Sequence, residues 1–232
     1  MTKPLRLGVA YDFRNAPESG LSHPRLYAEI MDQVAWLDGL GLDLVWFTEH
    51  HFVDDGYLPS WIPVAAAMAA RTKNVRFSCD VCLLPFNHPV RLAEDLAVLD
   101  NLSDGRVEIG VGMGYAPHEF KGFGLPLSRR VSLTDEGIAV LRRAFTGERF
   151  SFEGKRYSFH DVRITPGYVQ GAARRSGSRQ CPRRALGGPR ALPPTSCRRG
   201  RGRRRSMPGR PGCGRAAAIP MPSASASSAP AW

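Results

Sequence analysis

Several features that would define a function class are missing from the sequence. No run of about 18 or more apolar residues occurs, and the N-terminus lacks a charged segment followed by an apolar one. We therefore expect a cytoplasmic protein without membrane association. The five cysteines lack the spacing of a disulfide framework, and Cys79 and Cys82 lie in an apolar run without a second C-x-x-C. We expect them to be buried, reduced thiols rather than zinc ligands or a redox pair.

Acidic residues and lysine are missing from the last part of the chain. Val169 to Trp232 contains 14 arginines but no Asp, Glu or Lys, so the net charge of +11 comes from this tail and residues 1–168 are slightly acidic. The tail is mainly Arg, Gly, Ala, Pro and Ser, without helical or strand periodicity. Residues 169–232 are therefore expected to be disordered, or to be a GC-rich gene read out of frame after about codon 170. Arginines can hold nucleic acid through phosphates, but no interleaved aromatic residue or motif favours that role.

Strands and helices alternate along residues 1–168. Apolar runs predict strands at Leu5–Tyr11, Leu44–Thr48, Val75–Leu84 and Arg106–Val111, and helical spacing predicts helices over Pro24–Gly39, Trp61–Arg71, from His88-Pro89 onward, and Ser132–Phe145. This order is typical of a parallel sheet covered by helices, in a doubly wound fold or a (β/α)₈ barrel. Phe150 to Phe159 alternates as a hairpin outside that sheet, and Trp36 and Trp46 are expected in the core.

The stretch Val45 to Phe52 is where an apolar strand gives way to reactive side chains. The strand ends at Glu49, His50 and His51, and active groups of parallel β/α folds lie at the carboxyl ends of the strands. Side chains alternate along an extended chain, so His50 and His51 should point in opposite directions. This argues against a metal bound by both, and no metal site is predicted.

A second feature at the same predicted edge is a glycine loop. Gly110, Gly112 and Gly114 form G-x-G-x-G, but the dinucleotide fingerprint needs a glycine at Tyr115 and then a helix start, whereas Pro117 follows. A Rossmann site is therefore not favoured. The loop is either a tight strand exit that needs positive φ, or a bend without side chains that a flat ring or a phosphate can approach.

Four motifs in series resemble the luciferase-like flavin-dependent monooxygenases. They are Thr48-Glu49-His50-His51-Phe52, Leu84-Pro85-x-x-His88-Pro89-Val90-Arg91-x-x-Glu94-Asp95, Leu99-Asp100-x-Leu102-Ser103-x-Gly105-Arg106 and Gly110-Val111-Gly112-x-Gly114-Tyr115-x-x-x-Glu119-Phe120, within about Leu5 to Gln170. The resemblance implies an α/β fold of the (β/α)₈ TIM-barrel type, of which only the first four βα units are present. It implies an enzyme that oxygenates an organic substrate with reduced FMN, supplied by a flavin reductase, and O₂. Members of the wider family use F420 for hydride transfer instead.

The resemblance also assigns catalytic residues by position. His50 matches the histidine that acts in general acid/base chemistry beside the flavin ring, and Glu49 matches a carboxylate that frames the same pocket. Asp80 and Val81 fall where the family places small apolar residues against the ring, sometimes through a non-prolyl cis peptide. The carboxylate of Asp80 is unusual there, and we expect it either to face the substrate or to form a structural salt bridge.

The phosphate end of the cofactor is assigned in the same way. Gly112, Met113, Gly114 and Tyr115 would follow the ribityl chain and the phosphate, and Arg130, or Arg129 one residue earlier, matches a phosphate-binding arginine. Met113 stands where some members have an arginine, so backbone N–H groups and Arg130 would carry more of the binding.

A chain that contains only half of a parallel barrel is expected to associate with other copies of itself. It exposes a sheet edge and an apolar interior, which favours a homo-oligomer or aggregation. The alternatives to a monooxygenase are an F420-dependent oxidoreductase, or an inactive barrel fragment whose basic tail binds nucleic acid. Neither the substrate nor the activity of the truncated chain is predicted.

Overall fold

The sheet of the protein is parallel where the sequence predicted it. A computed structural model describes residues 5–170 and the backbone of 217–219. One sheet has the order β1 (Gly8–Tyr11), β2 (Leu44–Phe47) and β3 (Arg76–Cys79), and a second pairs β4 (Cys82–Leu83) with β5 (Ile109–Gly112), all parallel. An isolated parallel bridge between Phe77 and Val107 joins the two sheets. The α/β class is therefore confirmed.

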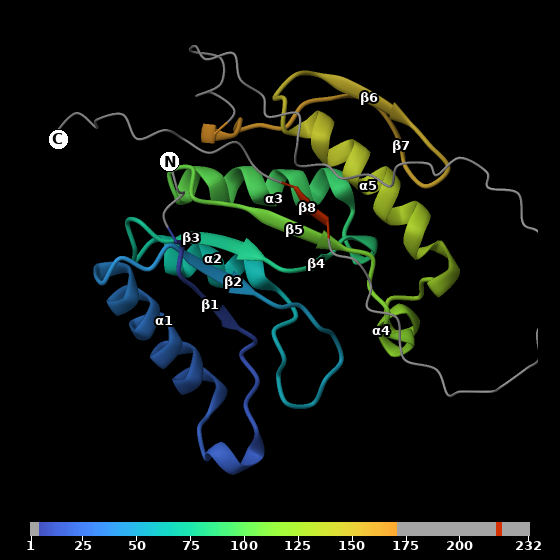
Figure 1. Ribbon diagram of the computed structural model, residues 1–232. Coiled ribbons are helices and arrows are strands. Elements are labelled where there is room, and N and C mark those ends of the chain that lie inside the picture. The colour runs from blue at the N-terminus through green and yellow to red at the C-terminus, as the bar shows by residue number, and fades with distance from the viewer. Residues whose placement is uncertain (1–4, 171–216, 220–232) are drawn as a thin grey trace, which may run out of the picture.

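Helices follow the strands and form a continuous layer (Figure 1). The main helices are α1 (His23–Gly39), α2 (Trp61–Ala69), α3 (Pro89–Leu102) and α5 (Arg130–Ala144). Each contacts the next in that order. Val45, Phe47 and Phe77 are fully buried, whereas Gly8, Trp46 and Arg76, which point the other way, line an open pocket. One face of the parallel strands is thus packed on helices and the other is not.

The predicted third strand is interrupted in its middle. Val75–Leu84 divides into β3 and β4 at a cis peptide between Asp80 and Val81. The neighbouring strand β5 makes room for this corner with glycines. A Cβ atom on Gly110 would lie 2.9 Å from the Cys79 carbonyl oxygen, and one on Gly112 would lie 2.4 Å from Cγ2 of Val81. The absent side chains of β5 therefore serve the packing of the corner.

The glycine loop is followed by a helix, contrary to the prediction. Pro117 begins the short helix α4 (Pro117–Gly122) at its first position, where its missing N–H and its fixed φ are both favourable. Reading Pro117 as evidence against a helix start was wrong, and the correction brings Glu119 into the first turn of α4.

The predicted hairpin is present on the outside of the helix layer. It consists of β6 (Phe150–Glu153) and β7 (Ser158–Val162) and lies along α5 (Figure 1). Glu136 of α5 anchors it by accepting hydrogen bonds from the N–H groups of Lys155, Arg156 and Tyr157.

The described residues continue two positions past the predicted boundary at residue 168. Gln170 is 1% exposed, and its side chain donates to Asp100 (2.7 Å) and to the Val107 carbonyl (2.9 Å). Ala217–Ile219 form β8, antiparallel to β5, because an open strand edge offers unpaired N–H and C=O groups to any extended segment. Residues 169–170 and 217–219 of the predicted tail thus belong to the described part of the chain. The rest of the expected disordered or frameshifted tail, residues 171–216 and 220–232, lies outside the described residues.

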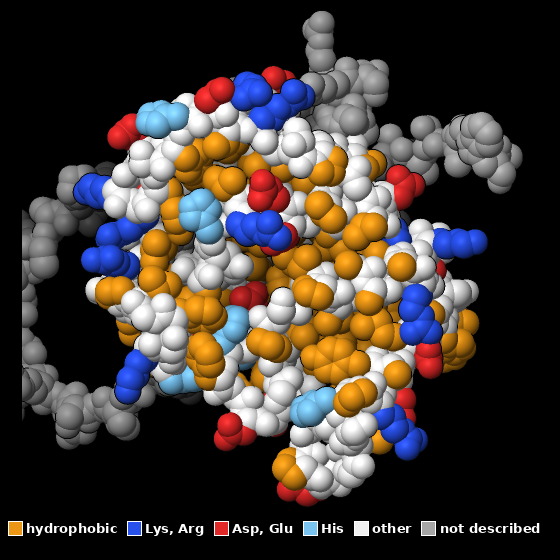
Figure 2. Space-filling model, turned by 180° about the vertical axis from the view of Figure 1, so that it is seen from behind, with side chains coloured by type: hydrophobic (Ala, Val, Ile, Leu, Met, Phe, Trp, Pro, Cys, Tyr) orange, Lys and Arg blue, Asp and Glu red, His pale blue; other side chains and the backbone are white. Residues whose placement is uncertain are grey.

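The surface combines hydrophobic and charged areas. On the face turned away from the viewer in Figure 1, hydrophobic side chains gather over much of the middle and most lysines and arginines lie toward the rim (Figure 2). Trp36 is 63% exposed, so its predicted place in the core was wrong. Cys79 and Cys82 are free and buried, as expected. Every helix in the described part of the chain is too short or too polar to cross a bilayer.

Candidate active site

The carboxyl ends of β2, β4 and β5 bring the predicted site residues to one edge. Glu49 follows β2 by two residues, and its Oε2 accepts a hydrogen bond from the N–H of Leu83 in β4 at 3.3 Å. Leu83 pairs in register with Gly112 of β5. The strand with the acidic and imidazole groups and the strand with the glycine turn therefore end at the same edge of the fold.

The two adjacent histidines have different carboxylate partners. Nε2 of His51 lies 3.1 Å from Oε1 of Glu49, and both side chains are almost fully buried, at 12% and 5% exposure. The His51 ring also contacts Phe86 and Phe123 edge-on. Glu49 thus interacts with His51 and the β4 backbone, and the His51 side chain is mostly buried.

His50 is held by a carboxylate that the sequence reading did not single out. Its Nδ1 lies 2.9 Å from Oε1 of Glu119, which also accepts a hydrogen bond from the backbone N–H of His51 at 2.9 Å. The Glu119 side chain is 0% exposed, and its Oε2 has no hydrogen-bond partner among the described residues. His50 itself is 25% exposed. This histidine therefore combines a buried anchor with an accessible ring.

Aromatic rings flank His50. Tyr57 lies edge-on at 4.7 Å between ring centroids, and Tyr115 lies edge-on at 6.0 Å. The guanidinium of Arg14 covers Tyr57 at 5.4 Å and is itself paired with Asp55. The direct contact between His50 and Tyr115 places the histidine beside the glycine turn.

The glycine turn offers free backbone donors. Gly114 has φ +68°, a conformation that favours glycine. The N–H groups of Met113, Gly114 and Tyr115 find no acceptor among the described residues. The Tyr115 side chain is 72% exposed. Consecutive unpaired N–H groups of this kind form a typical binding site for an anion or a polarised oxygen.

The cis peptide lies at the predicted position between Asp80 and Val81. Asp80 is exposed and Val81 partly exposed. Asp80 forms no ion pair with a described residue, so the expected structural salt bridge is not seen within residues 5–170. A role of Asp80 facing the substrate stays a prediction.

The two candidate arginines differ in how their side chains are used. Nη1 of Arg130, at the start of α5, donates to the carbonyl of Leu127 at 3.3 Å, and its other N–H groups have no described acceptor. Arg129 is exposed, and its side chain has no partner within the described residues. Both therefore keep donors available, and Arg130 is the better fixed.

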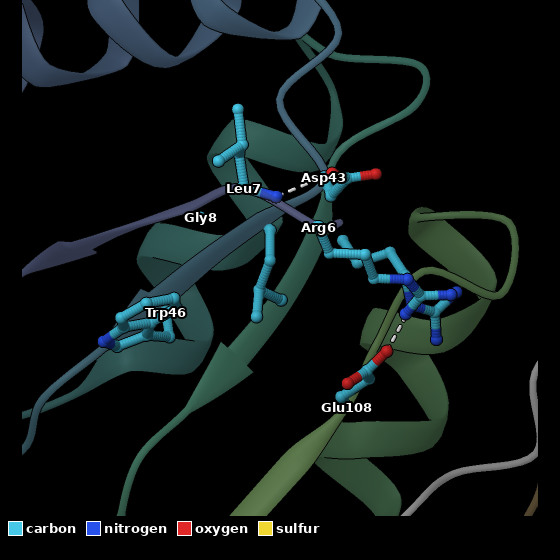
Figure 3. Close-up of a pocket in the computed structure, with 8 residues that line it drawn as sticks. Arg6, Leu7, Gly8, Asp43, Trp46 and Glu108 are labelled. Carbon is cyan, nitrogen blue, oxygen red and sulfur yellow. Dashed lines mark hydrogen bonds and ion pairs between the residues drawn. The ribbon is translucent and has the colours of Figure 1, made fainter. Parts of the chain in front are cut away.

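A second cluster of charged residues lies at the opposite, amino-terminal end of the strands (Figure 3). It surrounds a pocket of about 80 Å³ lined in part by Arg6, Asp43, Arg76 and Glu108. Arg76 is paired with Glu108 at 2.5 Å, and Asp43 accepts from the N–H of Leu7 at 2.8 Å. These positive and negative side chains neutralise one another. We therefore assign this end a structural role.

Metal or thiol chemistry has little support at the carboxyl edge. Within the residues that the structure describes, no three His, Cys, Asp or Glu side chains are grouped to hold a metal ion. Burial, with a smaller contribution from nearby Glu49, raises the pKa of the Cys82 thiol well above its usual range. A thiol held in its protonated form is a poor nucleophile and a poor ligand.

Comparison with known proteins identifies the family. The family model for luciferase-like monooxygenases matches residues 5–187, most of the chain. The chain belongs to this family. An alkanal monooxygenase alpha chain of Photorhabdus laumondii is 31% identical over 57% of this chain and 37% of its own length.

Solved structures of luciferase-like proteins share the fold. The monooxygenase RslO1 from Streptomyces bottropensis is 32% identical with a TM-score of 0.67, over 71% of this chain and 50% of that chain. The FMN complex of the oxygenating constituent of 3,6-diketocamphane monooxygenase from Pseudomonas putida has a TM-score of 0.62 at 23% identity, over 69% and 45%. The F420-dependent tetrahydromethanopterin reductase of Methanopyrus kandleri has 0.56 at 20%, over 73% and 48%.

These matches also define how much of a luciferase-like protein is present. The chain spans about a third to a half of the length of the relatives that it matches. The described residues nevertheless include chemistry that suits a flavin. They include the N–H groups of Met113 to Tyr115 and donors of Arg130 that have no acceptor among these residues, and the accessible ring of His50.

Proposed function

We propose that the chain derives from an FMN-dependent monooxygenase that oxygenates an organic substrate with O₂. The observation that carries this proposal is that an anchored, accessible imidazole lies at the carboxyl edge of parallel strands, beside a turn whose N–H groups have no acceptor within the described part of the chain. His50 touches Tyr115, and Tyr115 closes the turn. Reduced FMN supplies the electrons for oxygen activation when it is bound, and the protein provides binding, orientation and proton transfer.

His50 is the group that moves protons in this proposal. An imidazole changes charge near neutral pH, and one positioned general acid or base contributes roughly 10²–10⁴-fold to a rate. The ring is one-quarter exposed and bordered by Tyr57 and Tyr115, which leaves one ring nitrogen open to a ligand. Glu49 contributes indirectly, because its carboxylate holds His51 and the end of β4.

Backbone groups and one arginine would hold the anionic end of the cofactor. The N–H groups of Met113, Gly114 and Tyr115 can donate to ribityl or phosphate oxygens, and the free edge of the Arg130 guanidinium suits a phosphate. Val81, which is partly exposed, and Asp80, which is exposed, would lie against the ring.

The choice between FMN and F420 is tested by binding. One fold neighbour is crystallised with FMN and another is F420-dependent. Full-length chain is titrated without oxygen with reduced FMN and, separately, with reduced F420. Saturable binding of reduced FMN, with product formed only after O₂ and an aldehyde or ketone are added, supports the proposal. Binding of F420 alone favours an F420-dependent oxidoreductase, and binding of neither favours a non-catalytic fragment.

The chain spans only part of the length of its relatives, and this bears on its binding partners. We propose that residues 5–170 are the first half of a (β/α)₈ barrel, that a separate cytoplasmic reductase supplies the reduced flavin, and that exposed apolar groups favour self-association. Within the described residues β1 has a strand neighbour on one side only, and Leu5 and Leu7 beside it are 85% and 62% exposed. Size-exclusion chromatography with light scattering tests this, and a stable monomer would contradict it.

A further inference from the structure

We propose that Glu119 is a positioning residue that fixes the protonation pattern of His50. Its carboxylate holds the hydrogen of the imidazole on Nδ1, so Nε2 is the nitrogen that accepts and returns protons at the site. The structural part of this inference is independent of the cofactor, and its catalytic consequence rests on the proposed function.

The geometry of the shared oxygen defines the tautomer. Oε1 of Glu119 lies 2.9 Å from Nδ1 of His50 and 2.9 Å from the backbone nitrogen of His51. The backbone group can only donate, so Oε1 is already an acceptor there. A carboxylate that accepts from both neighbours requires hydrogen on Nδ1 of His50, which leaves the lone pair of the neutral ring on Nε2.

The other ring nitrogen faces the open part of the site. Nε2 of His50 has no hydrogen-bond partner among the described residues, and the side chain is 25% exposed. Tyr57 and Tyr115 stand edge-on to the ring and restrict its rotation. The His50 ring is held at Nδ1 by Glu119 and bordered by Tyr57 and Tyr115. Its Nε2 therefore points in one fixed direction, toward the open part of the site.

A comparison with Glu49 separates Glu119 from an ordinary structural carboxylate. Glu49 uses both oxygens, one toward His51 and one toward the N–H of Leu83. Glu119 is 0% exposed yet leaves Oε2 without a partner among the described residues. Unpaired buried oxygens are rare, because they cost the group its hydration. The hydrogen-bonded oxygen of Glu119 is therefore shared only by the His50 ring and the His51 backbone N–H among the described residues.

The proton balance of the step is simple. A proton leaves the reacting group and forms an N–H bond at Nε2, so the ring becomes an imidazolium while the Nδ1–H to Glu119 hydrogen bond stays in place. The positive ring and the Glu119 carboxylate then form an ion pair. The reverse transfer from Nε2 restores the neutral ring, and no oxidant or reductant takes part.

The direct test is ¹⁵N NMR of the imidazole rings in the full-length chain without cofactor. Signals of His50 and His51 are assigned with His50→Gln and His51→Gln, and spectra are recorded as the pH is raised until the ring signals no longer change. A pyrrole-like Nδ1 and a pyridine-like Nε2 for His50 are expected. The opposite pattern, or a mixture of tautomers, overturns the proposal, and this wild-type measurement needs no Glu119 variant to fold.

Matched variants distinguish positioning from general packing. Glu119→Leu is expected to convert His50 to a mixture of tautomers and to leave the His51 ring unchanged, whereas Glu49→Leu is expected to do the reverse. Glu119→Gln retains an acceptor oxygen and should restore the Nδ1–H tautomer of His50. An unchanged His50 spectrum in Glu119→Leu, or an equal change in Glu49→Leu, would contradict the assignment.

A kinetic double-mutant cycle tests the consequence for catalysis. Glu119→Leu should lower kcat at least roughly tenfold, a part of the ~10²–10⁴-fold effect of a positioned acid or base, with a smaller change in KM. Since Glu119 acts through His50, the double variant should be no slower than His50→Gln alone. Additive losses would overturn the inference. If no turnover is found in the wild type, the proposed function fails while the tautomer result still decides the role of Glu119.

Discussion

The two ends of the parallel strands are both rich in charged groups, but they use them in opposite ways. At the amino-terminal end Arg76 is paired with Glu108, and the buried guanidinium of Arg106 donates to five oxygens, among them the carbonyls of Ala69, Thr72 and Val75. At the carboxyl end an oxygen of Glu119 and three consecutive N–H groups have no hydrogen-bond partner among residues 5–170. Satisfied polar groups indicate stability, and unsatisfied ones at an open edge indicate binding.

The largest expected effect separates the two ends by activity. His50→Gln should lower turnover roughly 10²–10⁴-fold, because it removes the proton-transferring group, while the dissociation constant of reduced FMN changes far less. The control at the other end is Glu108→Gln, which should leave turnover unchanged. Steady-state kinetics and anaerobic flavin titration measure both quantities, and equal losses of rate and affinity would show that His50 only binds.

The next effect separates the ends by stability. Arg106→Met should lower the free energy of unfolding by about 3 kcal/mol or more, since buried oxygens lose their donor and each unpaired group costs about 1–3 kcal/mol. The matched control is Arg71→Met, which removes an exposed ion pair with Asp32 and should cost less than about 1 kcal/mol. Urea unfolding followed by circular dichroism provides the comparison, and similar losses would contradict the distinction.

A third prediction tests whether the glycines of β5 are needed for packing against the corner at Asp80–Val81. Gly112→Ala should destabilise the fold by about 1–3 kcal/mol, because its Cβ would lie 2.4 Å from Val81. Gly39→Ala is the control, since nothing lies within 4 Å of its Cβ position at the end of α1, and it should be neutral or stabilising by up to about 1 kcal/mol. Thermal unfolding measures both, and a neutral Gly112→Ala would show that the corner is not packed as described.

The smallest expected effect concerns pH at the amino-terminal end. Burial raises the pKa of Asp100 above its usual value of 3.8, although hydrogen bonds from Gln170 oppose the shift. Between the unfolded and the folded pKa the native state binds the extra proton, so stability should fall as the pH rises through this window above 3.8. Asp100→Asn should flatten that slope in urea unfolding. A slope that persists in the variant would assign it to another group.

Local sequence patterns predicted much of the fold. The βα order, the hairpin and the parallel sheet follow from periodicity, because a helix or a strand depends on residues close in the chain. The break at Asp80–Val81 was placed only by family resemblance, since an apolar run from Val75 to Leu84 gives no local sign of a corner. Trp36 was expected in the core from its type alone, but its direction on α1 leaves it 63% exposed.

The site was predicted less completely than the fold. His50 and the glycine turn were both predicted from the sequence as parts of the site, and in the structure they are in contact through Tyr115. Glu119 was missed as the partner of His50, because the two are 69 residues apart and their pairing depends on where α4 starts. The available signal was Pro117 followed two residues later by a carboxylate, which is typical of a helix N-terminus.

The central claim is that the carboxyl ends of the strands, and not their amino-terminal ends, bind the cofactor. Its most direct test is amide exchange measured by NMR on the full-length chain, with and without reduced FMN. We predict that the N–H groups of Met113, Gly114 and Tyr115 exchange quickly without the cofactor and are protected when it binds. Amides at the other end, such as Leu7 and Arg106, should be unaffected. Protection at the amino-terminal end instead, or none at the glycine turn under saturating reduced FMN, would contradict the assignment of the carboxyl edge as the cofactor site.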